Sequence, residues 1–410
     1  MTRRVVITGV GVVSALGLDH AAHCDALKAG RSGIGPITLI ETEGLSIPIA
    51  AEIPAFDGAE IFSKSELAMR DRVTQLALVA GGEAMAKAGL KGPSGEDRLD
   101  EADGLRGAVV VGTSIGGSQT VDAQYKALYG EQKSRLHPFT VPRLMANAPS
   151  SHLSMLFGLM GPAWTVSTAC SSSNHAIGQA FHLVRSGTAD FALAGGSESS
   201  LTYGVLKGWE GLRVMAKDAC RPFSKNRSGM VQGEGAAMLV IEDYERARAR
   251  GATILAEIVG FGMTADAGDI VQPSQDGAAR AMRQALDDGG VTPEEIGYIN
   301  AHGTGTVLND KTETAAIRQV FGPAADRLAV SSTKSMHGHC IGAAGALEAV
   351  AAVMALTDGV LPPTINYEEP DPECDLDIVP NTAQERQVSA VLSNTFAFGG
   401  LNAVLAFRAA

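Results

Sequence analysis

The sequence predicts an α/β protein, and two observations support this expectation. Short runs rich in Val, Ile and Ala alternate with longer amphipathic stretches, as in "GAVVVGT" (107–113), "FALAGGSE" (191–198) and "AAMLVIED" (236–243). Such runs are typical of buried strands, and the stretches between them suit crossover helices, so we expect parallel strands. The chain has 410 residues, of which 45% are hydrophobic, which is enough for a large core and two domain-sized units.

The first element expected is a buried strand within "MTRRVVITGVGVVSALGL" (1–18), followed by a glycine turn. A secretion signal is not favoured, because glycines interrupt the apolar stretch and no small-residue cleavage site follows. Gly9 and Gly11 begin a dinucleotide fingerprint, but Ser14 stands where the third glycine belongs. No segment reaches membrane-spanning length without a charge or glycine, so we expect no membrane partner.

A charge-rich stretch, "DYERARARGA" (243–252), precedes a new strand-like run, "ILAEIVGFGM" (254–263). We therefore place a boundary here, with an N-terminal half at 1–251 and a C-terminal half at 252–410. A weak internal repeat favours a fold with two duplicated halves: "ST" at 167–168 and at 332–333 is followed nine or ten residues later by "IG".

Composition excludes several classes of function. The formal net charge is -12 and the basic residues are scattered, so the sequence predicts no nucleic-acid partner. The cysteines are odd in number and form no CxxC pair, which argues against a disulfide framework and against a zinc site. A reducing, cytoplasmic location is expected. The five cysteines are Cys24, Cys170, Cys220, Cys340 and Cys374.

One cysteine lies where a helix is expected to begin. In "TVSTACSSSNHAIGQA" (165–180), apolar residues recur at helical spacing from Ala176, so the serines after Cys170 lie near the helix N-terminus. Unpaired N–H groups and the helix dipole there would stabilise a thiolate and lower the pKa of Cys170. The alternative is a structural cysteine, because free cysteines are among the most buried residues.

Two further stretches carry possible partners for this thiol. "NAHGTGT" (300–306) places His302 after a strand-like run, and "SSTKSMHGH" (331–339) places Lys334, His337 and His339 before a helical run carrying Glu348. A single histidine beside glycine is usually a turn residue. Here small residues let the backbone approach a ligand, and imidazole N–H groups can meet negative charge on an oxygen.

Together these stretches resemble a β-ketoacyl-acyl-carrier-protein synthase of the elongating kind, in the thiolase superfamily. The resemblance extends from about residue 3 to residue 407. The motifs that carry it are "TACSSS" around Cys170, "NAHGTGT" around His302, "SSTKSMHGH" with Lys334 and His339, "RPFSKNRSGMVQGEGA" (221–236) and "NTFAFGGLN" (394–402).

The resemblance implies a thiolase-like fold, with a duplicated, layered α-β-α-β-α architecture, and a Cys-His-His site. Cys170 would attack an acyl thioester, with the backbone N–H groups of Cys170 and Phe398 as the oxyanion hole. His302 and His339 would donate hydrogen bonds to a malonyl thioester and stabilise the enolate as the carboxylate leaves. Lys334 would orient the site together with Glu348. The reaction requires no metal or redox cofactor.

The resemblance selects His339 rather than His337 and makes Phe398 a gate over Cys170. Gly399 and Gly400 would give the gate its backbone freedom. The family usually has glycine and threonine where this chain has Ala397 and Leu401, so a stiffer gate is expected.

The resemblance also assigns substrate-binding residues. Thr304 and Thr306 would contact the substrate, and Ile115 would lie at the floor of the acyl pocket. Plain core packing is an equally good interpretation of Ile115 from its apolar context. A histidine and a threonine commonly line the family's pantetheine entrance, whereas this chain reads "GDIVQPS" (268–274).

The implied partners are an acyl carrier protein bearing acyl and malonyl groups, and a second copy of the chain. The family pairs its central strands across a homodimer, and the 48 glycines suit closely packed layers. Basic residues available to an acidic carrier, which are equally consistent with solvated surface charge, are Lys64, Arg70, Arg72, Lys133 and Arg135.

The favoured interpretation is elongation of fatty acyl chains. The same motifs fit a condensing enzyme that serves a dedicated carrier in specialised lipid, nodulation-factor-type or polyketide synthesis. A degradative thiolase would carry a second catalytic cysteine in a C-terminal glycine-rich loop, and neither Cys340 nor Cys374 has that context. A non-catalytic subunit that sets chain length would lack the cysteine at position 170.

Overall fold

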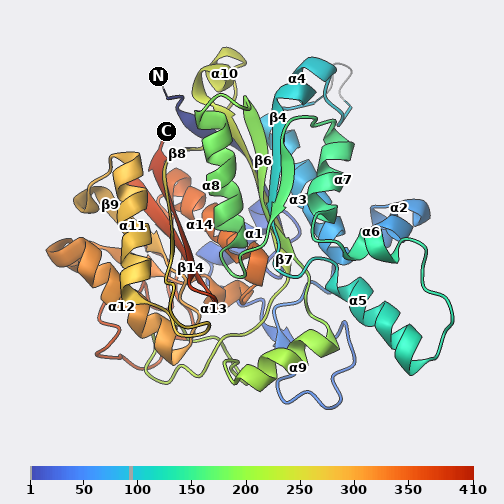
Figure 1. The fold of residues 1–410 in the computed structure, drawn as a ribbon. Coiled ribbons are helices and arrows are strands. Elements are labelled where there is room, and N and C mark those ends of the chain that lie inside the picture. The colour runs from blue at the N-terminus through green and yellow to red at the C-terminus, as the bar shows by residue number, and fades with distance from the viewer. Residues whose placement is uncertain (1, 92–95) are drawn as a thin grey trace.

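The computed structural model describes residues 2–91 and 96–410, and a mixed ten-stranded sheet runs through its centre (Figure 1). Two small pairs lie outside this sheet, β2 (Gly35–Pro36) with β3 (Ile49–Ala50) and β11 (Val360–Leu361) with β12 (Gln384–Glu385). The order across the large sheet is β10 (Ala329–Ser331), β9 (Ile296–Asn300), β13 (Ala390–Ala397), β14 (Leu401–Ala409), β8 (Ala256–Ala265), β1 (Val5–Ser14), β7 (Gly235–Asp243), β6 (Phe191–Glu198), β4 (Gly107–Gly112) and β5 (Ala163–Val166).

Of the helices, some cover both faces of this sheet and others lie beside it (Figure 1). They are α1 (His20–Lys28), α2 (Lys64–Met69), α3 (Arg72–Ala88), α4 (Glu101–Arg106), α5 (Ser118–Tyr125), α6 (Thr140–Leu144), α7 (Ala148–Phe157), α8 (Ser172–Arg185), α9 (Tyr203–Leu212), α10 (Tyr244–Ala249), α11 (Gln275–Gly289), α12 (Val307–Phe321), α13 (Lys334–His337) and α14 (Ala344–Asp358). Short helical turns complete the set: η1 (Gly58–Glu60), η2 (Lys126–Gly130), η3 (Pro293–Glu295), η4 (Gly322–Arg327) and η5 (Ile341–Ala343).

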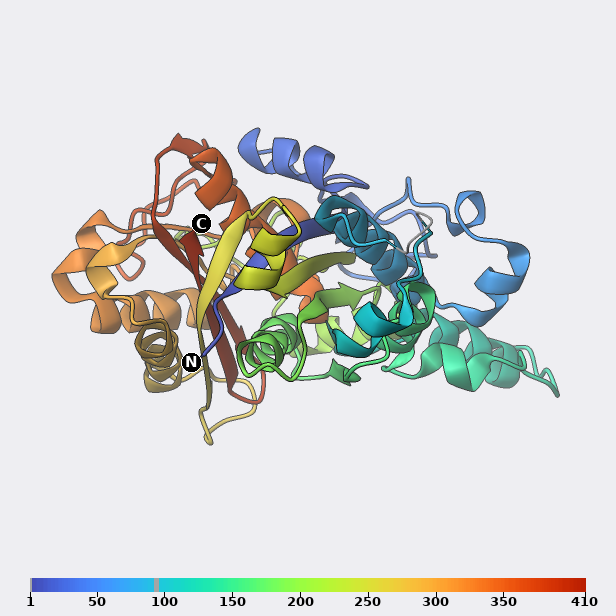
Figure 2. The same ribbon diagram turned by 90° about the horizontal axis from the view of Figure 1, so that it is seen from above.

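The layers follow α-β-α-β-α. Helices α3 and α7 pack on the outer face of the N-terminal strands, and α11 packs on β8 and β14. Helices α8 and α14 pack against each other and against strands of both halves, so they form the middle layer. Figure 2 shows most of the orange and red C-terminal half on one side of the molecule and most of the blue and green N-terminal half on the other.

The sheet is not the parallel sheet that the apolar runs led us to expect. β1 pairs antiparallel with β7 and β8, and β14 pairs antiparallel with β8 and β13. Parallel pairs join β4 to β5 and β6, and β9 to β10 and β13. Strands covered by helices on both faces are apolar whatever their direction, so hydrophobicity alone does not record it.

The glycines near the N-terminus serve helix packing. A Cβ on Gly9 would lie 2.1 Å from the carbonyl oxygen of Ala84 on α3, and one on Gly11 would lie 2.0 Å from that of Ala80. In the second half, Cβ atoms on Gly260 and Gly262 of β8 would lie 2.1 and 2.0 Å from carbonyl oxygens of α11. The same close approach of helix to strand thus occurs in both halves, which is the repetition expected of a duplicated fold.

The two halves meet where the first three residues of β1 pair with β8. The boundary expected at residue 251 falls between α10 and β8, and it stays a prediction. Residues 341–358, which include α14, form one helical stretch that is long and apolar enough to cross a membrane, and 89% of it is buried inside the protein. This stretch belongs to the core between the halves.

Candidate active site

Cys170 lies on a tight turn between β5 and α8. Ala169 has a φ of 51°, which is uncommon for a residue other than glycine. The carbonyl oxygen of Ala169 accepts hydrogen bonds from Ser172 Oγ at 2.6 Å and from Ser114 Oγ at 2.8 Å. These bonds hold the strained turn and place the thiol just before the helix N-terminus, whose capping residue is Ser171.

The pKa of the thiol differs from the sequence-based expectation. Burial raises the pKa of Cys170 to about 11, although Lys334 and the backbone N–H groups of Phe398 and Cys170 oppose this shift. The helix N-terminus is therefore present, but removing the sulfur from water outweighs it. The shift favours the neutral thiol over the thiolate, and the two N–H groups lie beside the sulfur.

His302 stands in a glycine-rich loop between β9 and α12. Its backbone N–H and that of Gly303 donate to the buried Glu313 carboxylate, at 2.9 and 2.8 Å. Lys334 Nζ donates to the His302 carbonyl oxygen at 2.6 Å and lies 3.4 Å from its Nδ1. Glu313 and Lys334 thus hold the loop through hydrogen bonds to its backbone. The other ring nitrogen of His302, Nε2, is left to donate a hydrogen bond.

His339, rather than His337, faces the cysteine. The N–H of Ile341 donates to His339 Nδ1 at 3.1 Å, so the ring proton of the neutral form lies on Nε2. His337 instead bonds to the Gly338 carbonyl oxygen and to Thr333 Oγ1, at 2.8 and 2.9 Å, and does not line the cavity of Cys170. Two histidines separated by one glycine therefore face different surroundings.

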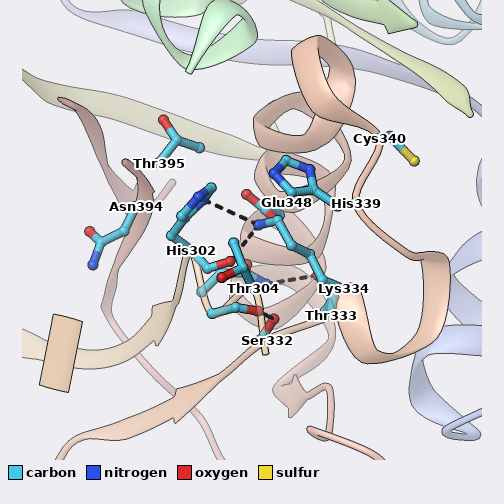
Figure 3. Close-up of polar contacts among 12 residues, drawn as sticks. His302, Thr304, Ser332, Thr333, Lys334, His339, Cys340, Glu348, Asn394 and Thr395 are labelled. Carbon is cyan, nitrogen blue, oxygen red and sulfur yellow. Dashed lines mark hydrogen bonds and ion pairs between the residues drawn. The ribbon is translucent and has the colours of Figure 1, made fainter. Parts of the chain in front are cut away.

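Lys334 and Glu348 form a completely buried ion pair behind His302. Figure 3 shows the Lys334 amino group between the His302 ring and Glu348. Burial lowers the pKa of both His302 and His339 well below the usual histidine value, and the charge of Lys334 lowers each further. Both imidazoles are therefore neutral hydrogen-bond donors at neutral pH.

The three groups converge. One ligand-type atom each from Cys170, His302 and His339 lies within 4.8 Å of the others, and the two rings are nearly perpendicular with centroids 5.5 Å apart. These three atoms are close enough together to ligate one metal ion. The raised thiol pKa and the adjacent Lys334 cation both work against binding a metal cation here.

These residues line a cavity of about 260 Å³ whose walls include Thr304, Thr306 and Gly400. Phe398 lies against Trp209, with ring centroids 5.9 Å apart, and both line the cavity. Thr304 Oγ1 and Thr306 Oγ1 are 2.8 Å apart. All of the proposed catalytic and substrate-binding residues in this region line the cavity, except Lys334 behind it and Gly399 beside it.

The segment expected to act as a gate, residues 398–400, is a three-residue connection between paired strands, because Ala397 at the end of β13 pairs with Leu401 at the start of β14. Gly399 and Gly400 have φ values of 83° and 70°, which glycine adopts without strain. The Gly399 N–H donates to the Ile270 carbonyl oxygen at 2.8 Å. The unusual 268–274 segment therefore contacts the gate directly, and Ile270 is 72% exposed at the cavity mouth.

Ile115 does not line the cavity of Cys170. It is 40% exposed and lines a second cavity of about 1130 Å³ together with residues of α5 and Tyr203. Its neighbour Ser114 donates to the carbonyl oxygen of Ala169 in the turn of Cys170, so Ile115 follows a residue that contacts this turn. Its role in measuring chain length stays a prediction.

The basic residues singled out for docking are not equally available. Arg72 pairs with the buried Glu234, and Arg70 is only 9% exposed and pairs with Glu66. These two residues support the fold, which corrects the expectation that they face a carrier. Lys133 is exposed and pairs with Glu131.

Sequence reasoning missed two residues that shape the site. Trp209 comes from α9 and its ring lies against Phe398, and the Glu313 carboxylate on α12 accepts the backbone N–H groups of His302 and Gly303. Neither carries a local signal, because their importance depends on which loops the fold brings beside them.

Comparison with known proteins agrees with this geometry. Residues 2–247 match the family described as Beta-ketoacyl synthase, N-terminal domain, and residues 255–368 match Beta-ketoacyl synthase, C-terminal domain. The chain is 49% identical over 408 residues to nodulation protein E of Rhizobium sp. (strain N33), covering 100% of both chains. It is 42% identical to 3-oxoacyl-[acyl-carrier-protein] synthase 2 of Staphylococcus aureus (strain COL), covering 99% of this chain and 98% of the relative.

A solved structure shares the fold over the full length of both chains. It is a type II polyketide ketosynthase in complex with its acyl carrier protein and bound to a hexaketide, with a TM-score of 0.89 and 30% identity, and it covers 100% of each chain. The matched domains, the relatives and this shared architecture lead to one conclusion. The chain belongs to the β-ketoacyl synthase family of acyl-transferring condensing enzymes and has their thiolase-like fold.

Proposed function

We propose that this synthase elongates fatty acyl chains by decarboxylative condensation of a malonyl group, carried by an acyl carrier protein, with an acyl group on Cys170. The observation that carries the proposal is the arrangement of one thiol and two neutral imidazoles within 4.8 Å, at a cavity bounded by Phe398. This arrangement supplies a nucleophile and two hydrogen-bond donors. The two imidazoles are neutral and already carry the proton that they donate, so their protonation does not have to change before they act.

The first half of the reaction transfers the acyl group. The Cys170 sulfur attacks the thioester carbonyl, the carrier sulfur leaves as a thiolate, and the proton of the Cys170 thiol passes to that sulfur. The N–H groups of Cys170 and Phe398 lie beside the sulfur and would stabilise the oxyanion of the tetrahedral intermediate. Because burial holds the thiol neutral, its proton would leave only as the thioester carbonyl comes into reach.

The second half forms the carbon–carbon bond. His302 and His339 donate through Nε2 to the malonyl thioester carbonyl, and the carboxylate leaves as CO₂ while an enolate forms. The enolate carbon attacks the acyl carbonyl on Cys170, and the released sulfur takes up one proton. Lys334 keeps the His302 proton on Nε2 because its ammonium group occupies the side of Nδ1.

A second candidate function has a specific observation in its favour. The 49% identity to nodulation protein E, together with the 268–274 segment, favours a condensing enzyme that serves a dedicated carrier in specialised lipid synthesis. The apolar side chains of Ile270 and Val271 line the cavity of Cys170, where a carrier arm would pass. The same catalytic residues would serve either pathway.

The test of the proposed function is intact-protein mass spectrometry after incubation with acyl carrier proteins that bear acyl groups of graded chain length. We expect an adduct on Cys170 with the mass of the acyl group. When malonyl-loaded carrier is added, the adduct should disappear and a carrier bearing the β-ketoacyl product should form. An adduct that persists in Cys170→Ala would contradict the assignment of the nucleophile. Loading of one carrier to the exclusion of another would distinguish the two pathways.

Ile115→Phe should shorten the range of acyl donors in the same assay. The larger ring would crowd the side of the second cavity next to Ser114 and the Cys170 turn, so long chains should react at least about tenfold more slowly while short ones keep their rate. Val121→Phe, which enlarges another residue of the second cavity, is the matched control. Equal losses for donors of every length would show that Ile115 supports the fold.

We further propose that two copies of the chain associate. β5 is the edge strand of the N-terminal half, and large apolar side chains are exposed in the neighbouring segment, namely Tyr125, Tyr129, Phe139, Val141, Met155 and Met160. An edge strand beside exposed apolar side chains favours pairing with a second copy. Light scattering at micromolar concentration should give twice the chain mass of 42.3 kDa, and a monomer would contradict the dimer.

The location that fits this function is the cytoplasm. All five cysteines are free thiols in the structure, as a reducing compartment requires. The carrier partner, the second copy and the cytoplasmic setting belong to one proposal, in which no nucleic acid and no membrane takes part.

A further inference from the structure

A buried carboxylate beside the active site has no part in the reaction described above. Glu198 ends β6 and is completely buried, and it forms no salt bridge with any residue that the structure describes. Burial raises the pKa of this carboxyl to about 7, against the effect of the hydrogen bonds that it accepts. A buried acid without a cation is costly to keep, so its hydrogen-bond partners are informative.

These partners come from two segments that are far apart in sequence. Glu198 Oε2 accepts the Ser114 N–H at 2.7 Å and the Gly342 N–H at 3.2 Å. Glu198 Oε1 accepts Thr113 Oγ1 at 3.3 Å and the Ile115 N–H at 3.4 Å. One carboxylate therefore joins the loop after β4 to the turn before α14.

Each of these segments leads directly to a reacting group. The Ser114 hydroxyl donates to the carbonyl oxygen of Ala169, the residue before Cys170. On the other side, Gly342 follows Ile341, whose N–H sets the proton position of His339. A Cβ on Gly342 would lie 2.5 Å from Ser114 N and 2.7 Å from Glu198 Oε2, so the two segments are as close as their backbones permit.

We propose that Glu198 is a positioning residue that sets the distance between the acyl group on Cys170 and the enolate held by His339. The inference rests on the proposed function. Acyl transfer uses Cys170 and decarboxylation uses the histidines, so each half can proceed without the other. Condensation requires both groups in one geometry, and a misplacement of about 1 Å costs on the order of 100-fold in rate.

The test is Glu198→Gln, measured in three assays: acyl adduct formation, malonyl decarboxylation and condensation of a preformed acyl-enzyme. The amide keeps the size of the side chain, but its nitrogen accepts no hydrogen bond and would face N–H donors. Condensation should fall about 10-fold to 100-fold. The two half-reactions should each change by less than about threefold, because each needs only one of the two segments.

Glu242→Gln is the matched control. Glu242 is equally buried and lies at the far end of β7, where Arg246 and Arg250 pair with it. Its loss should lower stability and reduce all three rates in the same proportion. A merely structural role of Glu198 would give this pattern too, and that result would overturn the inference.

A second variant keeps the test decisive if Glu198→Gln does not fold. In Gly342→Ala the added methyl group would clash with the backbone of Ser114 and push the same two segments apart. This variant should again slow condensation selectively. Equal loss of all three rates, or unchanged condensation, in this variant would overturn the inference. Absence of all three activities in the unchanged protein would contradict the proposed function itself, and the inference with it.

Discussion

Replacing Cys170 with glutamine is expected to abolish condensation while malonyl decarboxylation continues. The substitution removes the thiol that is proposed to carry the acyl chain, and loss of a nucleophile costs about 10⁴-fold or more in rate. The enolate depends on His302 and His339, which the substitution leaves in place, so decarboxylation should stay within about threefold of the starting rate. Acyl adducts are followed by mass spectrometry, and CO₂ release reports decarboxylation.

Cys340→Ala is the matched control for this variant. Cys340 is equally buried, follows His339 directly, and its thiol donates to the backbone rather than facing the cavity. Acyl transfer to Cys170 should survive its removal. Loss of decarboxylation together with condensation in Cys170→Gln would mean that the thiol takes part in both halves, which contradicts the separation of roles.

Removing the two imidazoles should have the converse effect. His302→Ala and His339→Ala should each lower decarboxylation by about 100-fold or more, the usual cost of losing one oxyanion donor, and the double variant should lose more. Acyl transfer to Cys170 should continue, because the oxyanion hole proposed for it consists of backbone N–H groups. Decarboxylation that survives unchanged in the double variant would exclude this assignment.

His337→Ala provides the matched control, since His337 is buried in the same motif but lies outside the cavity. The pKa shifts add a further expectation. Both active-site histidines have a pKa well below 6.5, so they stay neutral above that pH and keep their donor protons. Decarboxylation should therefore not decline between pH 8 and pH 6.5 through titration of these rings.

Some of this protein could be determined from its sequence alone. The runs at 107–113 and 191–198 are strands β4 and β6 within one residue, and the helix expected after Cys170 begins at Ser172. The three loop motifs that carry Cys170, His302 and His339 also come together as expected. Local patterns suffice here, because periodicity and the residues at helix ends act over a few neighbouring positions.

Other properties were decided only by the tertiary structure. The direction of the central strands does not follow from apolar runs, and the pKa of Cys170 rises although the helix N-terminus is where we expected it. The resemblance selects His339 over His337, but the physical reason, that the turn aims His339 and not His337 into the cavity, comes only from the structure. Glu198 joins two segments that are distant in sequence. Burial and long-range hydrogen bonds set these properties, and both depend on residues that become neighbours only when the chain has folded.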